Sequence, residues 1–413
     1  METVSFKYGK QVVELPVPEQ VHRFTFNEPV QAISEETFVQ DFERLISTVI
    51  LSATTKVAIV VADKTRLCGY KRIIPWVVST LQCKSITESQ LTFYIAYGTH
   101  PRQTQTECLA AYGESYNRYQ FVHHDCSDEH GFELLGTTSR GTEVKVRKDV
   151  LNSDLIITVG AVSHHYFAGY GGGRKLLFPG LAEKNAIYSN HRLFLNKERR
   201  QLAAGCWPGN LEGNPLASDL KEIHDMLPDY LSIHAILDSN GNPATYHFGR
   251  SYDDFLVVCK TLDRCYKIEE AERFDLVVAS AGGYPKDINI IQSHKAIHNT
   301  ANLVRDGGTL IVLAECRDGV GSKTFLPYFN MGGRDAAFSE LIQHYVGNGG
   351  TALAMMEKTE RIRICLVTEL PEEVCLKIGT EKMSLGEAGS VIASHSGKAG
   401  FVQNGSLLVA NRW

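Results

Sequence analysis

The stretch HHYFAGYGGGRKLLFPGLAEKNAIYSNHRL (164–193) combines several residue types that carry chemistry. It holds imidazoles at His165 and His191, the amine of Lys175 and a run of three glycines. Imidazoles transfer protons near neutral pH and bind borderline metals such as nickel, zinc or copper. A lysine amine pairs with phosphate, or acts as a nucleophile when burial lowers its pKa. A nucleotide loop, a metal site and a nucleophilic lysine would each explain only part of the stretch.

The glycines Gly171, Gly172 and Gly173 precede the basic pair Arg174-Lys175. Residues without a Cβ let backbone N–H groups approach an anion, so the run suits a phosphate-binding turn. A tight turn between a strand and a helix would use the same residues. The run is not a dinucleotide-binding motif in its usual context, and no GK[ST] follows to make a Walker loop. Both interpretations stay open on the residues alone.

Other polar residues with chemical potential follow apolar runs elsewhere in the chain. In ADKTR, Asp63 suits the cap of a following helix, and the guanidinium of Arg66 offers a planar fork for a carboxylate. In GTHP, His100 precedes a proline that begins a helix well. Gln292 and Lys295 occupy a similar position later in the chain. Together these side chains favour acid–base chemistry on a small carboxylate.

The elements that must position these residues are short apolar runs. The runs at 55–62, 91–96 and 154–160 each break into a polar loop and then a helical pattern, and the rhythm restarts at 275–279 and 309–314. Continuous apolar runs of this length are typical of parallel strands covered on both faces. In open α/β sheets, ligands bind in the loops at the carboxyl ends of the strands. We therefore expect the polar residues to gather at those ends.

The length of 413 residues favours two domains, each with its own core. We expect an α/β fold of two domains with mainly parallel, doubly wound sheets and the active site in the interdomain cleft. Residues 1–270 are predicted to form an N-terminal cofactor-binding catalytic domain, and residues 271–413 a C-terminal α/β domain. The tail after about residue 395 is expected to pack back on the first domain, and 269–273 (EEAER) is predicted to be a helical link.

Composition excludes several classes of partner. The formal net charge of −5 provides no basic stripe for nucleic acid. The first residues, METVSFKYGK, resemble no signal peptide, and no apolar run is long enough to span a membrane. The ten cysteines are scattered without a C-x-x-C pair, which predicts reduced thiols. A cytoplasmic protein without nucleic-acid or membrane partners is expected.

With these residues in view, the chain resembles the nickel-pincer lactate racemase family. Lys175 lies ten residues after His165 and sixteen before His191, as that family requires. The other matching segments are DKTR (63–66), GTH (98–100), the opening stretch through Pro179-Gly180, GYPKD (283–287) and QSHK (292–295).

The resemblance implies a cofactor and a metal. Lys175 would be joined covalently to the nickel-pincer nucleotide, which is pyridinium-3,5-bisthiocarboxylic acid mononucleotide nickel. His191 would supply the remaining nickel ligand. The glycines Gly171, Gly172 and Gly173 would let the phosphate of the nucleotide approach the backbone. Separate biosynthetic enzymes make this cofactor, so the resemblance also implies these enzymes as partners.

The resemblance further implies an isomerase, a racemase or epimerase that inverts the α-carbon of a 2-hydroxy acid. The family reaction is a proton-coupled hydride transfer through a 2-keto acid. His100 and His165 would alternate as general base and acid on opposite faces of the substrate. The implied substrate-binding residues are Asp63, Arg66, Gln292 and Lys295, with Asp63 orienting its neighbours.

One departure from the family concerns the substrate. Many relatives continue DxTR with prolines, whereas this chain continues LCGYKR (67–72), so that Lys71 and Arg72 add positive charge near the predicted carboxylate site. Lactate, a dicarboxylic acid or a sugar-derived 2-hydroxy acid are all open as substrates.

Two other functions stay open beside the racemase. One is a zinc-dependent hydrolase using His165 and His191, which would lack an acidic ligand motif and leave Lys175 without a role. The other is a non-catalytic nucleotide- or anion-binding protein, which would leave Asp63, His100 and Lys295 unexplained.

Overall fold

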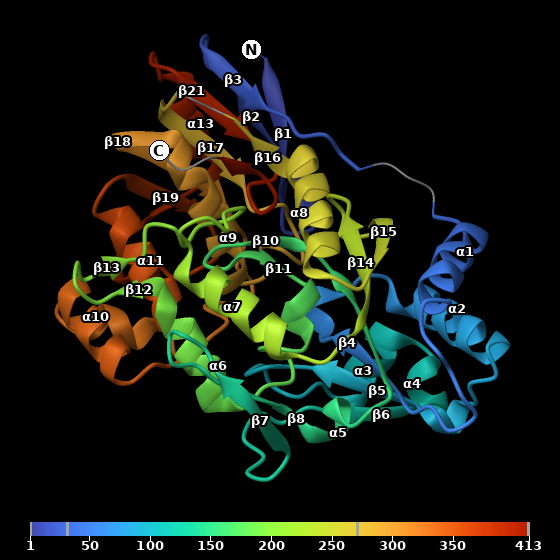
Figure 1. Cartoon of the computed structure of the whole chain (residues 1–413). Helices are drawn as coiled ribbons and strands as arrows, with labels where there is room; N and C mark the ends of the chain where they lie inside the picture. Colours follow the sequence, from blue (N-terminus) through green and yellow to red (C-terminus); the bar gives the residue numbers. More distant parts are fainter. Residues whose placement is uncertain (1, 30–32, 270–271, 411–413) are drawn as a thin grey trace. The chain divides into compact units, whose positions relative to one another are not determined.

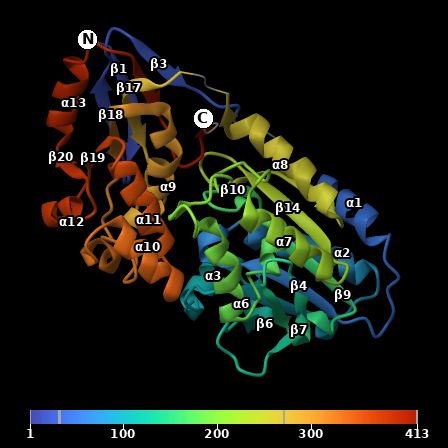
Figure 2. The ribbon, with the colours of Figure 1, turned by 60° about the vertical axis from the view of Figure 1, so that its left-hand side comes forward.

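A computed structural model describes residues 2–29, 33–269 and 272–410 of the chain (Figures 1 and 2). The chain folds into two compact units. Unit 1 comprises Met1–Asn27, Leu195–Gly209 and Asp263–Trp413, and unit 2 comprises Glu28–Phe194 and Asn210–Leu262. The chain passes from one unit to the other after Asn27, Phe194, Gly209 and Leu262. The predicted boundary near residue 270 lies close to the last of these points, and the other three were not expected from the sequence.

Unit 2 is built on a six-stranded sheet in the order β15-β14-β9-β4-β5-β6. All neighbouring strands run parallel except the edge strand β15, which pairs antiparallel with β14. The strands are β4 (Val57–Ala62), β5 (Leu91–Ala96), β6 (Gln120–His123), β9 (Leu155–Ala161), β14 (Leu231–Leu237) and β15 (Pro243–Gly249). The three apolar runs predicted in this part of the chain are β4, β5 and β9.

The strands of unit 2 are interleaved with helices. Every residue of β4 is buried, as expected for a strand covered on both faces. In α1, Phe38, Phe42 and Ile46 recur every four residues and are buried, so one stripe of this helix enters the core. Figure 2 shows α1 beside α2, which follows β4. The helices are α1 (Glu35–Ile46), α2 (Tyr70–Cys83), α3 (Gln105–Tyr112), α4 (Ser115–Arg118), α5 (Lys148–Leu151), α6 (Lys184–His191), α7 (Pro215–Met226) and α8 (Tyr252–Tyr266).

Two hairpins and two 3-10 helices complete this description of unit 2. The hairpin β7 (Phe132–Thr137) and β8 (Glu143–Arg147) lies between β6 and α5 in the chain. A second hairpin, β10 (Ser163–His165) and β11 (Gly169–Gly171), follows β9 directly. The 3-10 helices η1 (Lys64–Arg66) and η3 (Gly173–Leu176) follow β4 and β11.

Unit 1 contains a second six-stranded sheet, in the order β20-β19-β18-β17-β21-β3, and all of its neighbours are parallel. Its strands are β3 (Val21–Phe24), β17 (Phe274–Ser280), β18 (Val304–Leu313), β19 (Arg363–Val367), β20 (Glu381–Met383) and β21 (Ala399–Val402). The predicted α/β fold with mainly parallel sheets is therefore confirmed. Its placement of the active site between the two domains stays a prediction.

The two ends of the chain meet in the sheet of unit 1. Figure 1 shows β3, in blue, next to β21, in red, and the two strands pair in parallel. This pairing explains why the first residues belong to unit 1. The segment after residue 395 supplies β21, which also pairs with β17.

The remaining elements of unit 1 are helices and short strands. The helices are α9 (Ile290–Thr300), α10 (Arg334–Gln343), α11 (Gly349–Thr359), α12 (Glu372–Lys377) and α13 (Leu385–Ala393). The strands are β1 (Thr3–Tyr8), β2 (Gln11–Pro16), β12 (Leu195–Asn196), β13 (Gln201–Leu202), β16 (Lys267–Ile268) and β22 (Val409–Ala410).

The predicted helical link at 269–273 lies partly outside the described residues, and its described residues are not helical. The helix in this region is α8, which ends at Tyr266, before the acidic run. Within the ranges that the structure describes, no helix combines the length and the apolar character needed to cross a membrane.

Candidate active site

One pocket of unit 2 lies at the carboxyl ends of β4, β5 and β9, where parallel sheets bind ligands. Eight of the residues singled out in the sequence line it: Asp63, Arg66, His100, His165, Gly171, Gly172, Lys175 and His191. Gly173 neighbours the pocket in sequence but does not line it. Gln292 and Lys295 lie on α9 in unit 1, so their part in substrate binding stays a prediction.

Two buried tyrosines fix the end of β4. The Tyr70 hydroxyl accepts a hydrogen bond from the Ala62 amide at 2.7 Å and donates to the Val159 carbonyl at 2.8 Å. The Tyr112 hydroxyl donates to the Ala62 carbonyl at 2.8 Å. Both backbone groups of the last strand residue are thereby held, and the next residue, Asp63, has a defined position.

Asp63 forms a hydrogen-bonded pair with His100. Oδ1 of Asp63 accepts from the amide and hydroxyl of Thr65 at 2.7 and 2.6 Å, and Oδ2 lies 2.6 Å from Nδ1 of His100. Burial acts to raise the pKa of the Asp63 carboxyl, but His100, Thr65 and Arg66 outweigh it and lower that pKa to about 2. The ionised carboxylate can only accept, so neutral His100 carries its proton on Nδ1 and a lone pair on Nε2.

His165 is held differently. It ends β10, where it faces Gly169 across the hairpin. Its Nδ1 accepts hydrogen bonds from the backbone amides of Phe167 at 3.3 Å and Ala168 at 3.1 Å. The preceding His164 packs against the Tyr170 ring, with centroids 5.5 Å apart, and does not line the pocket. Only one imidazole of the pair therefore reaches this site.

Lys175 lies in η3, directly after the glycine turn, and its partly exposed side chain lines the pocket. Desolvation, followed by the charges of Arg66 and Arg174, holds the pKa of the Lys175 amine well below its usual value. No carboxylate pairs with this amine among the residues that the structure describes. The lowered pKa favours the uncharged, nucleophilic form of the amine relative to an ordinary lysine.

Packing within the protein explains part of the glycine turn, and its phosphate-binding role stays a prediction. Gly172 has a φ of +75°, and a Cβ there would lie 2.2 Å from the Ala161 carbonyl oxygen. A Cβ on Gly173 would lie 2.7 Å from the Phe255 ring. Protein packing alone thus requires two of the three glycines. A Cβ on Gly171 would come no closer than 3.4 Å to its nearest neighbour, the Ser163 hydroxyl oxygen. Packing therefore does not require a glycine at this position, which lines the pocket.

His191 ends α6 with its Nδ1 directed to the backbone. Nδ1 donates to the Ile187 carbonyl at 2.8 Å, which leaves the lone pair on Nε2. Desolvation and the neighbouring Lys175 lower the pKa of His191 to about 4, although the bond to Ile187 opposes the shift. The neutral imidazole is the form that binds metals.

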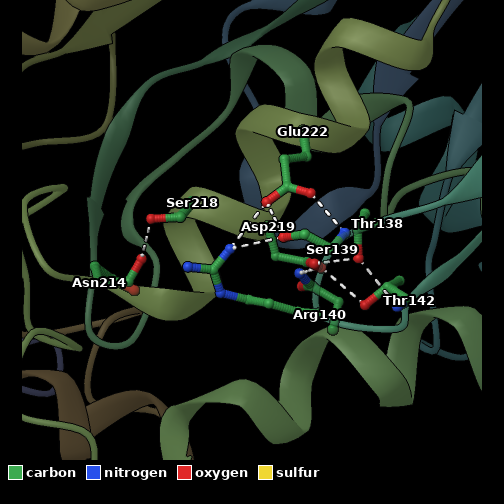
Figure 3. Close-up of polar contacts among 9 residues, drawn as sticks. Thr138, Ser139, Arg140, Thr142, Asn214, Ser218, Asp219 and Glu222 are labelled. Atoms are coloured by element: carbon green, nitrogen blue, oxygen red, sulfur yellow. Dashed lines mark hydrogen bonds and ion pairs between the residues drawn. The ribbon is translucent and has the colours of Figure 1, made fainter.

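A buried carboxylate on α7, that of Asp219, anchors α6 from outside the pocket. Figure 3 shows Asp219 with Thr138 and Thr142. Asp219 on α7 is fully buried, and it accepts from Asn190 at 2.8 Å, Thr138 at 2.5 Å and Thr142 at 2.8 Å. Asn190 immediately precedes His191, so this network fixes the helix end that carries the imidazole. No signal in the sequence indicates these residues, because threonines and an asparagine far from Asp219 in the chain show no common pattern.

The pocket supplies few metal ligands of its own. Within 2–29, 33–269 and 272–410, no three His, Cys, Asp or Glu side chains are grouped to hold a metal ion. A catalytic zinc site takes three protein ligands. A group that brings most of its own donors needs only one, and Nε2 of His191 is suited to that role. Lys175 and His191, which line one pocket, thus fit a tethered metal cofactor.

Three further basic residues noted in the sequence do not line the pocket. Arg174 is 2% exposed and lies against the rings of Tyr252 and Phe255 at 5.4 and 4.8 Å from their centroids. Lys71 and Arg72 are exposed at the start of α2, and neither lines the pocket. The extra charge noted in the sequence therefore does not enter this pocket.

The fold and site define an α/β enzyme with an Asp–His pair, a second imidazole and a lysine amine of lowered pKa in one pocket. Residues 8–203 match the profile of the lactate racemase N-terminal domain, and residues 269–349 that of the lactate racemase C-terminal domain. The chain belongs to the lactate racemase family and is an enzyme of the isomerase class.

Two lactate racemases are similar in sequence. One, from Thermoanaerobacterium thermosaccharolyticum, is 28% identical over 341 residues, which are 80% of this chain and 78% of the relative. The other, from Lactiplantibacillus plantarum, is 27% identical over 277 residues, which are 67% of this chain and 63% of the relative.

Two solved structures share the fold. The lactate racemase apoprotein from Thermoanaerobacterium thermosaccharolyticum has a TM-score of 0.86 at 24% identity, over 99% of this chain and all of that one. A crystal structure of a protein from Thermotoga maritima has a TM-score of 0.69 at 15% identity, over 94% of this chain and all of that one.

Proposed function

We propose that this protein is a racemase or epimerase that inverts the α-carbon of a 2-hydroxy acid. The relatives named lactate racemase support this class of reaction. The observation that carries the proposal is that His100, His165, Lys175 and His191 line one pocket at the carboxyl ends of parallel strands.

The proposal includes the nickel-pincer nucleotide, with Lys175 as its covalent attachment point and His191 as a ligand of its nickel. When bound, this group supplies a reversible acceptor for the hydride of the substrate α-carbon. The Lys175 amine, whose pKa is lowered, and the Nε2 lone pair of His191 fit these roles. Gly171 leaves backbone accessible for the phosphate of the nucleotide.

Proton transfer is assigned to the imidazoles. Nε2 of His100 accepts the hydroxyl proton of the substrate, and the Asp63 carboxylate stabilises the imidazolium that forms. The two enantiomers present their hydroxyl groups in opposite directions, so a second proton-transferring group, His165, is needed. Both rings line the same pocket.

Binding of the substrate carboxylate is assigned to Arg66, because a guanidinium matches a carboxylate in shape and charge. Gln292 and Lys295 are proposed as further substrate ligands. Nζ of Lys295 donates to Oε1 of Gln292 at 2.8 Å, so the two side chains act as one polar group on α9.

The proposed partners are the small 2-hydroxy acid and the enzymes that make the cofactor. A cytoplasmic location and the lack of nucleic-acid partners remain expectations from composition. Lactate and larger 2-hydroxy acids are both retained as substrates.

A panel of enantiopure 2-hydroxy acids tests this function. The protein is produced together with the cofactor biosynthetic enzymes, and products are separated by chiral chromatography. Interconversion of at least one pair, abolished by Lys175→Arg, is the expected result. Absence of any interconversion while the protein hydrolyses esters or amides with bound zinc would favour the hydrolase. Tight nucleotide binding without turnover would favour the binding protein.

A further inference from the structure

The two imidazoles of the pocket use their Nδ1 atoms in opposite ways. In His100 this atom meets a carboxylate, and in His165 it meets two backbone amides. The proton of a neutral imidazole resides on one nitrogen, and the partner of the other nitrogen determines which one. The partners therefore decide which edge of each ring accepts a proton.

For His100, the partner is an acceptor. Both oxygens of Asp63 are occupied: Thr65 donates twice to Oδ1, and Oδ2 is 2.6 Å from the ring. Nδ1 must donate, so the neutral ring has its lone pair on Nε2. This is the arrangement in which a carboxylate holds an imidazole ready to act as a base.

For His165, the partners are donors. The amides of Phe167 and Ala168 both point at Nδ1, which must therefore be unprotonated, and the neutral ring has its proton on Nε2. Protonating Nδ1 would break both hydrogen bonds.

Asn214 holds the peptide that makes one of these bonds. Its Nδ2 donates to the Phe167 carbonyl at 2.9 Å, and its Oδ1 accepts from the Ala217 amide at 3.0 Å as the N-cap of α7. Asn214 is fully buried. Figure 3 shows Asn214 at the start of α7, in contact with Ser218. Asn214 thus links the start of α7 to the peptide group between Phe167 and Ala168. The amide of that peptide group donates to His165, so Asn214 also positions the His165 ring.

We propose that His100 and His165 are held in opposite neutral tautomers, so that the pocket offers one proton acceptor and one proton donor, with Asn214 as the positioning residue for His165. This inference rests on the proposed function and adds a preferred direction to it. The enantiomer whose hydroxyl meets His100 finds a base, whereas the other finds a ring that must first exchange its tautomer. For a racemisation, kcat and KM then differ between the enantiomers while kcat/KM stays equal.

The direct test is ¹⁵N NMR of the full chain labelled at histidine and without cofactor, at a pH where both rings are neutral. His100→Gln and His165→Gln assign the signals. We expect a protonated Nδ1 in His100 and an unprotonated Nδ1 in His165. The same tautomer in both rings, or averaged signals for His165, would overturn the proposal. The measurement is independent of turnover, so the proposed function stands or fails separately.

Two variants test the causes. In Asp63→Asn, the single side-chain oxygen accepts the hydrogen bonds from Thr65, which turns the amide NH₂ toward His100. The His100 tautomer is therefore expected to invert.

Asn214→Asp keeps an acceptor for the Ala217 amide but loses the donor to the Phe167 carbonyl, so the Nδ1 signal of His165 is expected to shift. Ser218→Ala, which removes the neighbouring hydroxyl that donates to the Asn214 carbonyl, is the matched control and is expected to leave both rings unchanged. An unchanged His165 signal in Asn214→Asp would remove Asn214 from the account. Should that variant not fold, the wild-type tautomers and Asp63→Asn still decide the main proposal.

Discussion

The Asp63 carboxylate and the His100 ring are joined by a contact of 2.6 Å between Oδ2 and Nδ1. Asp63 is 4% exposed, whereas the His100 side chain is 45% exposed. A buried anion thus holds the inner edge of a ring whose other edge remains accessible. This is the geometry of a general base that is oriented by a carboxylate.

Asp63→Asn should lower kcat by about 10²- to 10⁴-fold, which is the usual contribution of general acid–base catalysis. The reason is that the lone pair of His100 is turned away from the substrate. Initial rates with an enantiopure 2-hydroxy acid on cofactor-loaded protein measure this effect. Glu88→Gln, which removes an exposed carboxylate paired with Arg118, is the control and should retain full activity. A rate for Asp63→Asn within a few-fold of wild type would remove Asp63 from the mechanism.

The same carboxylate should make stability depend on acid pH. The pKa of Asp63 is about 2 in the folded protein and 3.8 in the absence of its partners, so the folded state favours the ionised form. This contribution, about 2 kcal/mol, is present above pH 4 and is lost as pH falls through 2. Urea unfolding of wild type and Asp63→Asn at several pH values should show a difference that shrinks below pH 4. A difference that is constant with pH would contradict the depressed pKa.

Lys175 should react with an acylating reagent at pH 7 faster than exposed lysines, because its lowered pKa raises the share of uncharged amine. Arg174→Met removes a positive charge, so the pKa of Lys175 should rise and its reaction should slow. Arg72→Met removes an exposed guanidinium outside the pocket and serves as the control. Peptide mass spectrometry after brief labelling quantifies each lysine. Slower labelling of Lys175 than of exposed Lys71 would refute the lowered pKa.

The glycine turn gives a pair of variants that separates folding from ligand access. Gly172→Ala should lower the free energy of unfolding by about 2 kcal/mol or more, because a Cβ would meet the Ala161 carbonyl at a positive φ. Gly171→Ala finds space and should unfold like wild type, yet it should carry less cofactor if the phosphate approaches this backbone. Denaturant unfolding and bound nickel, measured on both variants, check the two statements. Normal cofactor loading of Gly171→Ala would show that the phosphate lies elsewhere.

Removing the buried carboxylate of Asp219, which anchors α6, should destabilise the protein. Asp219→Ala leaves the donors of Thr138, Thr142 and Asn190 without their acceptor, so the free energy of unfolding should fall by about 3 kcal/mol. Glu222→Gln on the same helix changes a partly exposed ion pair with Arg140 and should cost less than about 1 kcal/mol. Equal losses of unfolding free energy in the two variants would show that the buried network contributes no more to stability than the exposed ion pair.

The sequence predicted the parts of the fold that depend on local patterns. The apolar runs ending at Ala62 and Ala96 are strands that end where expected, since buried parallel strands read as continuous apolar segments. The polar residues after them do share one pocket. The helical link at 269–273 was wrong in its described part, because acidic composition does not by itself start a helix.

Contacts between residues far apart in the chain could not be predicted from the sequence. Asp219 and Thr138 are 81 positions apart, and Asn214 reaches Phe167 across 47 positions. Asparagine before proline suggests a helix start at Asn214, but no pattern indicates what its amide would hold. The membership of β3 in unit 1 depends on a strand pairing with β21 that spans nearly the whole chain.

The proposed covalent attachment at Lys175 is tested most directly by peptide-level mass spectrometry of protein produced with the cofactor biosynthetic enzymes. We predict a mononucleotide-sized adduct on Lys175 with bound nickel, and neither in Lys175→Arg. Unmodified Lys175 in a preparation that still interconverts 2-hydroxy acid enantiomers would contradict the account.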